Sequence, residues 1–169
     1  VLMAGICRTD IYVSRGWIQN VKDNLTVGHE FMGVVEESQS DKFKKGDLVA
    51  CNPIFDNLKM LGVDYDGCFA EYIKVYDTKL YHADGVDLKM GAYAEPIAAS
   101  IAPFTSQLID KKKVGAIYGD NRIGKLTYEI LKDADYNVVL LNEHDQHPSD
   151  YYDYVIETFS QVEAFDEVI

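Results

Sequence analysis

The chain has 169 residues, of which 47% are hydrophobic and 26% charged, and 28 acidic against 16 basic side chains give it a net charge of −12. This is the composition of an ordinary folded protein, long enough for one domain or two small ones. The acidic excess argues against binding to nucleic acid or to an anionic membrane, because both need a concentrated basic face. No apolar run approaches the roughly 20 residues of a membrane span.

Cysteine usage and the chain ends add two expectations. Three cysteines, an odd number, do not form a disulfide framework. This usage is typical of a reducing compartment, so we expect a cytoplasmic protein. The chain begins at Val1 rather than at a methionine and stops at Ile169 inside an apparently regular segment. We therefore expect a fragment, or a sequence from which segments are missing.

Short strand-like segments dominate the first half of the chain. They are predicted at residues 1–6, 26–35 with a continuation to 36, 47–51 and 69–75. In the last of these, two sets of side chains alternate along the segment, which is typical of a half-buried strand. This density of short strands predicts a distorted barrel or sandwich.

Helical composition begins at residues 87–90, and a helix is predicted from Glu95 onward. Pro96 then lies in the first turn, where its missing N–H does no harm. Pro103 is expected to end this helix after about two turns, because proline removes an interior hydrogen bond. The positive end of the helix favours an ionised Glu95 carboxylate.

From residue 114 the pattern changes to strand, glycine turn and helix. The predicted elements are a strand at 114–118, a turn at 119–124, a helix at 126–132 and strands at 137–142 and 152–157. The first four form the opening β-α-β of a dinucleotide-binding unit. Only nine residues separate the last two strands. A right-handed crossover takes a dozen or more, so we expect either a reduced domain or missing residues.

Three side chains have metal-binding chemistry: Cys7, His29 and Glu95. Thiolate, imidazole and carboxylate together form a mixed ligand set that suits zinc. Each residue is weak evidence by itself, since a lone cysteine is more often a small buried hydrophobic residue.

These residues belong to five short motifs that occur in a fixed order. The motifs are Gly5-Ile6-Cys7-Arg8-Thr9-Asp10, Gly28-His29-Glu30, Lys45-Gly46-Asp47-Leu48-Val49, Asp66-Gly67-Cys68-Phe69-Ala70-Glu71-Tyr72 and Ala94-Glu95-Pro96. Together they resemble the zinc-dependent medium-chain alcohol and polyol dehydrogenases, and Ala-Glu-Pro is typical of the sorbitol- and threonine-dehydrogenase-like branch. The resemblance implies an α/β plus β-rich fold. A GroES-like catalytic domain at 1–105, with its N-terminal part missing, precedes a partial Rossmann-like nucleotide-binding domain at 106–169.

The resemblance also implies roles for the site residues. Cys7, His29 and Glu95 would hold one catalytic zinc ion and leave a fourth position open. Glu30 would be a neighbouring carboxylate that exchanges with the ligand at the open position; the alternative is a surface acid at the start of a strand. Thr9 would be the first station of a proton relay, since in an extended segment it points to the same side as Cys7. No structural zinc is expected, because residues 53–62 contain no cysteine.

Two residues beside Cys7 are expected to tune the site. Asp10 is predicted to orient a neighbouring side chain rather than to react. Arg8 stands where the family has glycine. Its cation either favours an anionic or phosphorylated substrate or pairs with Asp10.

The predicted nucleotide turn keeps the first and last glycines of the G-x-G-x-x-G pattern but has Asn121 at the middle position. Asparagine tolerates a positive φ, yet its side chain takes up space near the phosphates. An acid follows the second strand, where it would hold the adenosine ribose, and no arginine follows it, so NAD is favoured over NADP. The predicted cofactor-binding residues are Gly119, Asn121, Arg122, Ile123, Gly124, Asn142 and Glu143.

The predicted function is hydride transfer between a nicotinamide cofactor and a secondary alcohol, polyol or sugar derivative. We expect a small-molecule substrate and a homo-oligomer, dimer or tetramer, for the full chain. Two alternatives stay open: a non-catalytic relative that serves as a binding or assembly module, and a zinc-independent reductase of the same fold.

Overall fold

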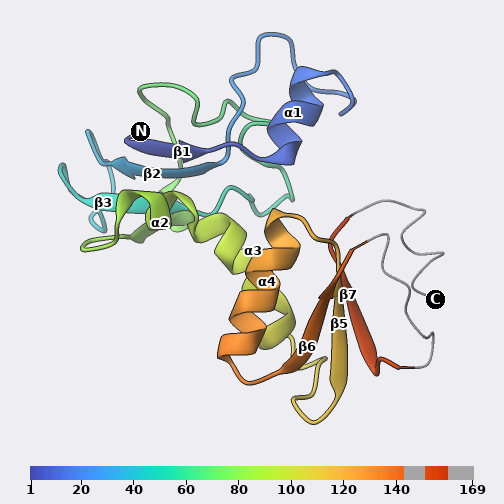
Figure 1. Cartoon of the computed structure of the whole chain (residues 1–169). Coiled ribbons are helices and arrows are strands. Elements are labelled where there is room, and N and C mark those ends of the chain that lie inside the picture. The colour runs from blue at the N-terminus through green and yellow to red at the C-terminus, as the bar shows by residue number, and fades with distance from the viewer. Residues whose placement is uncertain (143–150, 160–169) are drawn as a thin grey trace. The chain divides into compact units, whose positions relative to one another are not determined.

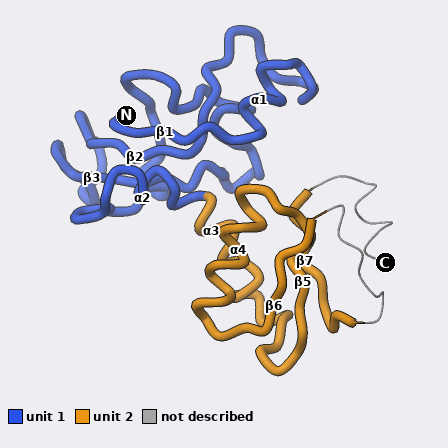
Figure 2. Tube along the Cα trace, viewed as in Figure 1, with its two compact units in different colours: residues 1–95 blue, residues 96–169 orange. Residues whose placement is uncertain are grey.

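The computed structural model describes residues 1–142 and 151–159 of the chain. The chain divides into two compact units, Val1–Glu95 and Pro96–Ile169 (Figure 2). The predicted domain boundary, between residues 105 and 106, lies at the other end of helix α3 (Ala94–Thr105), the helix in which the two units join. No helix in the described ranges is long and apolar enough to cross a membrane.

The first unit contains a four-stranded antiparallel sheet of order β1-β2-β3-β4 (Figure 1). Its strands are β1 (Met3–Gly5), β2 (Glu30–Val34), β3 (Leu48–Cys51) and β4 (Leu80–His82). The first three confirm predicted strands in shortened form. The register pairs Gly5 with Glu30, so the motif after β1 leaves the sheet where the Gly-His-Glu motif enters β2.

The strand predicted at residues 69–75 is wrong. The backbone at the start of this segment forms hydrogen bonds with a distant part of the chain, because the amides of Gly67, Cys68 and Phe69 donate to carbonyl oxygens of residues 26–28. Residues 70–79 contain no strand. The strand that pairs with β3 is β4 at Leu80–His82. Ile73 and Val75 still pack against the core, which explains why the alternation resembled a strand.

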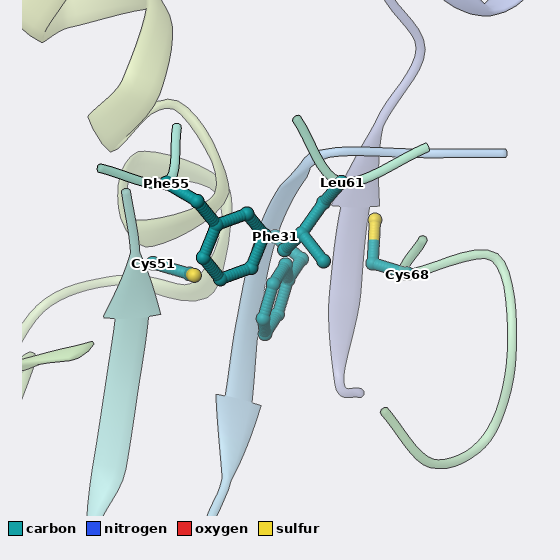
Figure 3. Packing of buried hydrophobic residues seen from close by; sticks show 5 residues of the cluster. All are labelled: Phe31, Cys51, Phe55, Leu61 and Cys68. Carbon is teal, nitrogen blue, oxygen red and sulfur yellow. The ribbon is translucent and has the colours of Figure 1, made fainter. Parts of the chain in front are cut away.

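That core is formed by Phe31, Cys51, Phe55, Leu61 and Cys68. In Figure 3 the rings of Phe31 and Phe55 lie between the two cysteines. Burial raises the pKa of both Cys51 and Cys68 to about 12, so each is a protonated, unreactive thiol at neutral pH. The side chains of both cysteines are thus part of the packed core.

Three short helical segments complete the first unit: α1 (Arg8–Ser14), η1 (Asp77–Lys79) and α2 (Leu88–Ala92). The extended conformation expected around Thr9 is wrong, because α1 begins directly after Cys7. Asp10 explains the helix, since it lies in the first turn and its Oδ2 accepts from the backbone N of Cys7 at 2.7 Å.

Helix α3 continues through Pro103 to Thr105 and is therefore longer than predicted. Pro103 lies in the last turn, so its missing N–H removes a single bond near the helix end. The Thr105 hydroxyl donates to the carbonyl of Ala102 at 3.2 Å and further satisfies this end of the helix.

The second unit contains a parallel sheet of order β6-β5-β7. Its elements after α3 are β5 (Val114–Tyr118), α4 (Arg122–Asp133), β6 (Asn137–Leu141) and β7 (Tyr154–Glu157). The predicted β-α-β and the later strand are thus confirmed. Leu131 of α4 packs on Ile117 and Val138 of the sheet. The segment expected to be too short for a crossover lies largely outside the described residues.

Candidate metal centre and nucleotide turn

Cys7, His29 and Glu30 converge at the junction of β1, α1 and β2. One ligand atom from each lies within 4.8 Å of the other two. His29 and Glu30 are buried, with 3% and 0% of their surface exposed, and Cys7 is half-buried. A thiol, an imidazole and a carboxyl group gathered in so small a volume form a candidate metal centre.

Asp10 is buried beside this cluster, with 4% of its surface exposed. Oδ2 accepts from the backbone N of Cys7 at 2.7 Å, and Oδ1 accepts from that of Gly28 at 3.0 Å. The buried Nδ1 of His29 makes no well-aligned hydrogen bond and lies 3.3 Å from Oδ1. Nδ1 of His29 thus faces Asp10, which leaves Nε2 as the nitrogen that a metal would bind.

The electrostatics of the cluster favour the charged forms of its members. Burial opposes ionisation of Cys7, but hydrogen bonds with His29 and the Thr9 backbone outweigh it, so the pKa of Cys7 is lowered. Burial also disfavours the imidazolium, yet contacts with Asp10 and Cys7 raise the pKa of His29 to about 10. The lowered pKa favours the thiolate, which is the form of sulfur that binds a metal, whereas His29 must release its proton before Nε2 can bind one.

Thr9 and Gly5 lie directly beside these groups. The Cys7 thiol is 3.9 Å from the Thr9 hydroxyl. The sequence analysis expected these two groups to be close because the segment would be extended, and here the first turn of α1 brings them together. At Gly5 an added Cβ would lie 2.4 Å from Oε2 of Glu30. Only glycine leaves room here for the Glu30 carboxylate, a role that the sequence analysis did not assign.

Glu95 is not a member of the close group, although it was the third predicted ligand. It is the second residue of α3 and is half-buried, while Glu30 provides the carboxylate next to Cys7 and His29. His29 precedes β2 and Glu30 begins it, so the alternation that separates neighbouring side chains in a strand does not apply to this pair. Glu95 as a ligand stays a prediction.

The donor set fits zinc. Sulfur, nitrogen and oxygen donors at a half-buried position, with a carboxylate that orients the histidine, match the preferences of this ion. Cys7, His29 and Glu30 would hold it. Among the residues that the structure describes, this is the one group of three or more potential metal-ligand side chains found close together.

The turn after β5 keeps two glycines for a steric reason. Gly119 has φ +130, and a Cβ on Gly124 would lie 1.8 Å from the Gly119 carbonyl oxygen. Helix α4 therefore packs close to the end of β5, as nucleotide-binding units require. Asp120 forms an ion pair with Lys125 at 2.8 Å, and Arg122 is the first residue of α4.

Asn121 does not use the positive φ that asparagine tolerates. Its φ of −108 is extended, and its side chain caps α4 by accepting from Ile123 N at 3.0 Å and Gly124 N at 3.1 Å. Its amide nitrogen donates to the Thr158 carbonyl at 2.9 Å. Asn142 follows β6, and Glu143 lies outside the described residues.

Comparison with known proteins identifies the family of this fold. The model of the alcohol dehydrogenase GroES-like domain matches residues 1–85. The chain therefore belongs to the zinc-type medium-chain alcohol and polyol dehydrogenase family.

Three relatives illustrate the match. The chain is 34% identical to an L-threonine 3-dehydrogenase of Caldanaerobacter subterraneus over 154 residues, which is 78% of this chain and 44% of the relative. A galactitol-1-phosphate dehydrogenase of Escherichia coli superposes with a TM-score of 0.70 at 25% identity, covering 81% of this chain and 45% of its own. An alcohol dehydrogenase of E. coli CFT073 in complex with NADH gives a TM-score of 0.71 at 26% identity, and the match covers 97% of this chain and 56% of that one. The chain thus spans about half the length of these relatives.

Proposed function

We propose that this chain forms the metal centre and part of the nucleotide site of an oxidoreductase that transfers a hydride between a nicotinamide cofactor and an alcohol, polyol or sugar derivative. The observation that carries this proposal is the cluster of Cys7, His29 and Glu30 with Asp10 behind it. Named dehydrogenases among the relatives support it.

The chain's own residues suit this chemistry. A bound zinc ion would supply a Lewis acid that lowers the pKa of an alcohol hydroxyl. Thr9, within 3.9 Å of the Cys7 sulfur, would accept the released proton and pass it on. Glu30 would neutralise the site's positive charge, and Glu95 would complete the ligand set if α3 brings it to the metal.

Two finer proposals concern the ligands. We favour NAD over NADP because Glu143 follows the second strand without a nearby arginine, and the E. coli CFT073 relative binds NADH. We favour an anionic substrate because the exposed Arg8 is adjacent to Cys7 and the galactitol-1-phosphate dehydrogenase named above is a structural relative. Location in the cytoplasm and assembly into a dimer or tetramer stay predictions.

Activity is tested by following NADH formation from neutral and phosphorylated polyols. We expect oxidation of at least one polyol, abolished in Cys7→Ser. If Arg8→Gly turns over the neutral and the phosphorylated polyols at the same rates as the parent, Arg8 has only a structural role. A zinc-independent reductase would turn over fully after chelation, and that result would refute the proposal.

The second candidate is a non-catalytic relative that keeps the fold as a binding module. The capped turn at Asn121 favours it, because the helix amides that a phosphate would use already have an acceptor. Titration with NAD and NADP discriminates the two candidates, since the module should bind neither.

A further inference from the structure

Asn121 and Thr158 are joined by side-chain hydrogen bonds across the end of the sheet. The Asn121 amide nitrogen donates to the carbonyl oxygen and to the hydroxyl oxygen of Thr158, at 2.9 and 3.0 Å. The Thr158 hydroxyl in turn donates to the Tyr118 carbonyl at 3.1 Å. With the two bonds from α4 to Asn121 Oδ1, these contacts tie the turn after β5 to the residue that follows β7. We call the pair the Asn121–Thr158 clamp.

The clamp adds a steric constraint at the two remaining glycines of the turn. A Cβ on Gly119 would lie 2.2 Å from the Thr158 hydroxyl oxygen and 2.9 Å from the Asn121 amide nitrogen. A Cβ on Gly124 would lie 3.0 Å from the same hydroxyl. In nucleotide-binding turns the middle glycine, which Asn121 replaces here, gives the backbone access to a diphosphate. Here the Asn121 side chain accepts from two amides of the turn and binds Thr158.

We propose that the Asn121–Thr158 clamp is an internal substitute for the cofactor's diphosphate, and that Asn121 sets the affinity of the chain for a nicotinamide dinucleotide. This inference rests on the proposed function, which supplies the ligand. A diphosphate binds the backbone amides at a helix N-terminus, and two of those at the start of α4, Ile123 N and Gly124 N, already donate to Asn121 Oδ1. The dinucleotide therefore binds only to molecules in which the clamp has opened.

Opening has a thermodynamic consequence. When the competent form is a minor population, the apparent dissociation constant rises by the reciprocal of that fraction. Removing the Asn121 side chain abolishes the closed form and the cap together. Affinity for NADH should then rise while the stability of the ligand-free chain falls, and a residue with a purely structural role would lower both.

The experiment compares the parent with Asn121→Gly by calorimetric titration with NADH and by thermal unfolding without ligand. We expect the variant to bind NADH at least about fivefold more tightly, since several hydrogen bonds no longer compete. Its melting temperature should be lower than that of the parent. Thr158→Val, which removes one of the two bonds from the Asn121 amide, should show a smaller change in the same directions.

Asp87→Gly is the matched control. Asp87 caps α2, in the other compact unit, through the same two kinds of backbone contact, to Lys89 N and Met90 N. Its loss should lower the melting temperature and leave the NADH affinity unchanged. NADH binding by Asn121→Gly at or below parent affinity overturns the inference and leaves the proposed function standing. Binding by neither protein overturns both.

Discussion

At the scale of single residues, the candidate metal centre depends on one buried carboxylate. Asp10 accepts from two backbone amides and faces the Nδ1 of His29, and these contacts, with burial opposing them, leave the pKa of Asp10 below its ordinary value. A single side chain thereby fixes the backbone at Cys7 and the ring of His29. The contacts support the prediction that Asp10 orients a neighbour, and the role itself stays a prediction.

Asp10→Asn tests this role. The amide keeps the size of the carboxylate but presents an NH2 group to one of the two backbone amides, so a buried donor loses its acceptor. We expect unfolding in urea to show a loss of about 1–3 kcal/mol. Zinc affinity should fall roughly 10- to 100-fold, because the histidine loses its orienting charge. Asp23→Asn, at an exposed position, is the control and should change neither quantity.

Gly5→Ala tests the contact between β1 and Glu30. The new methyl group would lie 2.4 Å from Glu30 Oε2, so the carboxylate must move away from the cluster. We expect zinc affinity to fall by about tenfold or more. At Gly33, on β2, the same substitution meets its first neighbour at an ordinary 3.5 Å. If Gly33→Ala weakened zinc binding as much as Gly5→Ala, the contact with Glu30 would not be the cause.

At the scale of elements, the prediction succeeded where the signal is local. The strand at 114–118 was predicted at its observed bounds, because a buried apolar run, a glycine turn and a helical period follow one another. Residues 69–75 misled the prediction because the chain enters this segment bonded, through the amides of Gly67, Cys68 and Phe69, to residues 26–28, which lie far away in the sequence. Thr9 was placed in an extended segment because the capping contact of Asp10, which starts α1, has no signature in apolar periodicity.

The pairing of β7 with β5 leads to a pH prediction. Asp153 Oδ2 accepts from Val114 N at 2.8 Å, and Oδ1 pairs with Lys113 at 3.0 Å. These contacts, the backbone bond first, lower the pKa of Asp153. Its contribution to stability is therefore complete above the unfolded-state pKa and is lost as the pH falls through the lower, folded-state value.

Asp153→Asn should destabilise the chain at neutral pH and should flatten its acid sensitivity. Unfolding midpoints in urea, measured near pH 7 and near pH 3, should differ less in the variant than in the parent. An identical pH dependence in both proteins would show that the bond to β5 forms equally well with a protonated or neutral side chain.

At the scale of the whole molecule, two compact units carry two kinds of site, and they differ in how far the sequence predicts them. Cys7 and His29, the proposed metal ligands, were predicted because each lies in a short motif. Glu30 was expected only as a neighbouring carboxylate, and its place in the close group with Cys7 and His29 depends on the pairing of Glu30 with Gly5 across β1 and β2. Thr158 was missed entirely, because it meets Asn121 across 37 positions of sequence and belongs to no motif.

The most direct test of the central claim is the zinc content per chain after dialysis, measured for the parent, Cys7→Ser, Glu30→Gln and Glu71→Gln. Cys7 and Glu30 belong to the close cluster, whereas Glu71 is exposed. We expect about one zinc ion per parent chain, unchanged in Glu71→Gln and largely lost in the two cluster variants.

Glu95→Gln, measured beside them, decides whether α3 contributes a further ligand: loss of zinc would add Glu95 to the set, and retention would leave Glu30 as its carboxylate. A parent chain that holds no zinc, or cluster variants that hold as much as the parent, would contradict the assignment of Cys7, His29 and Glu30 as a metal centre.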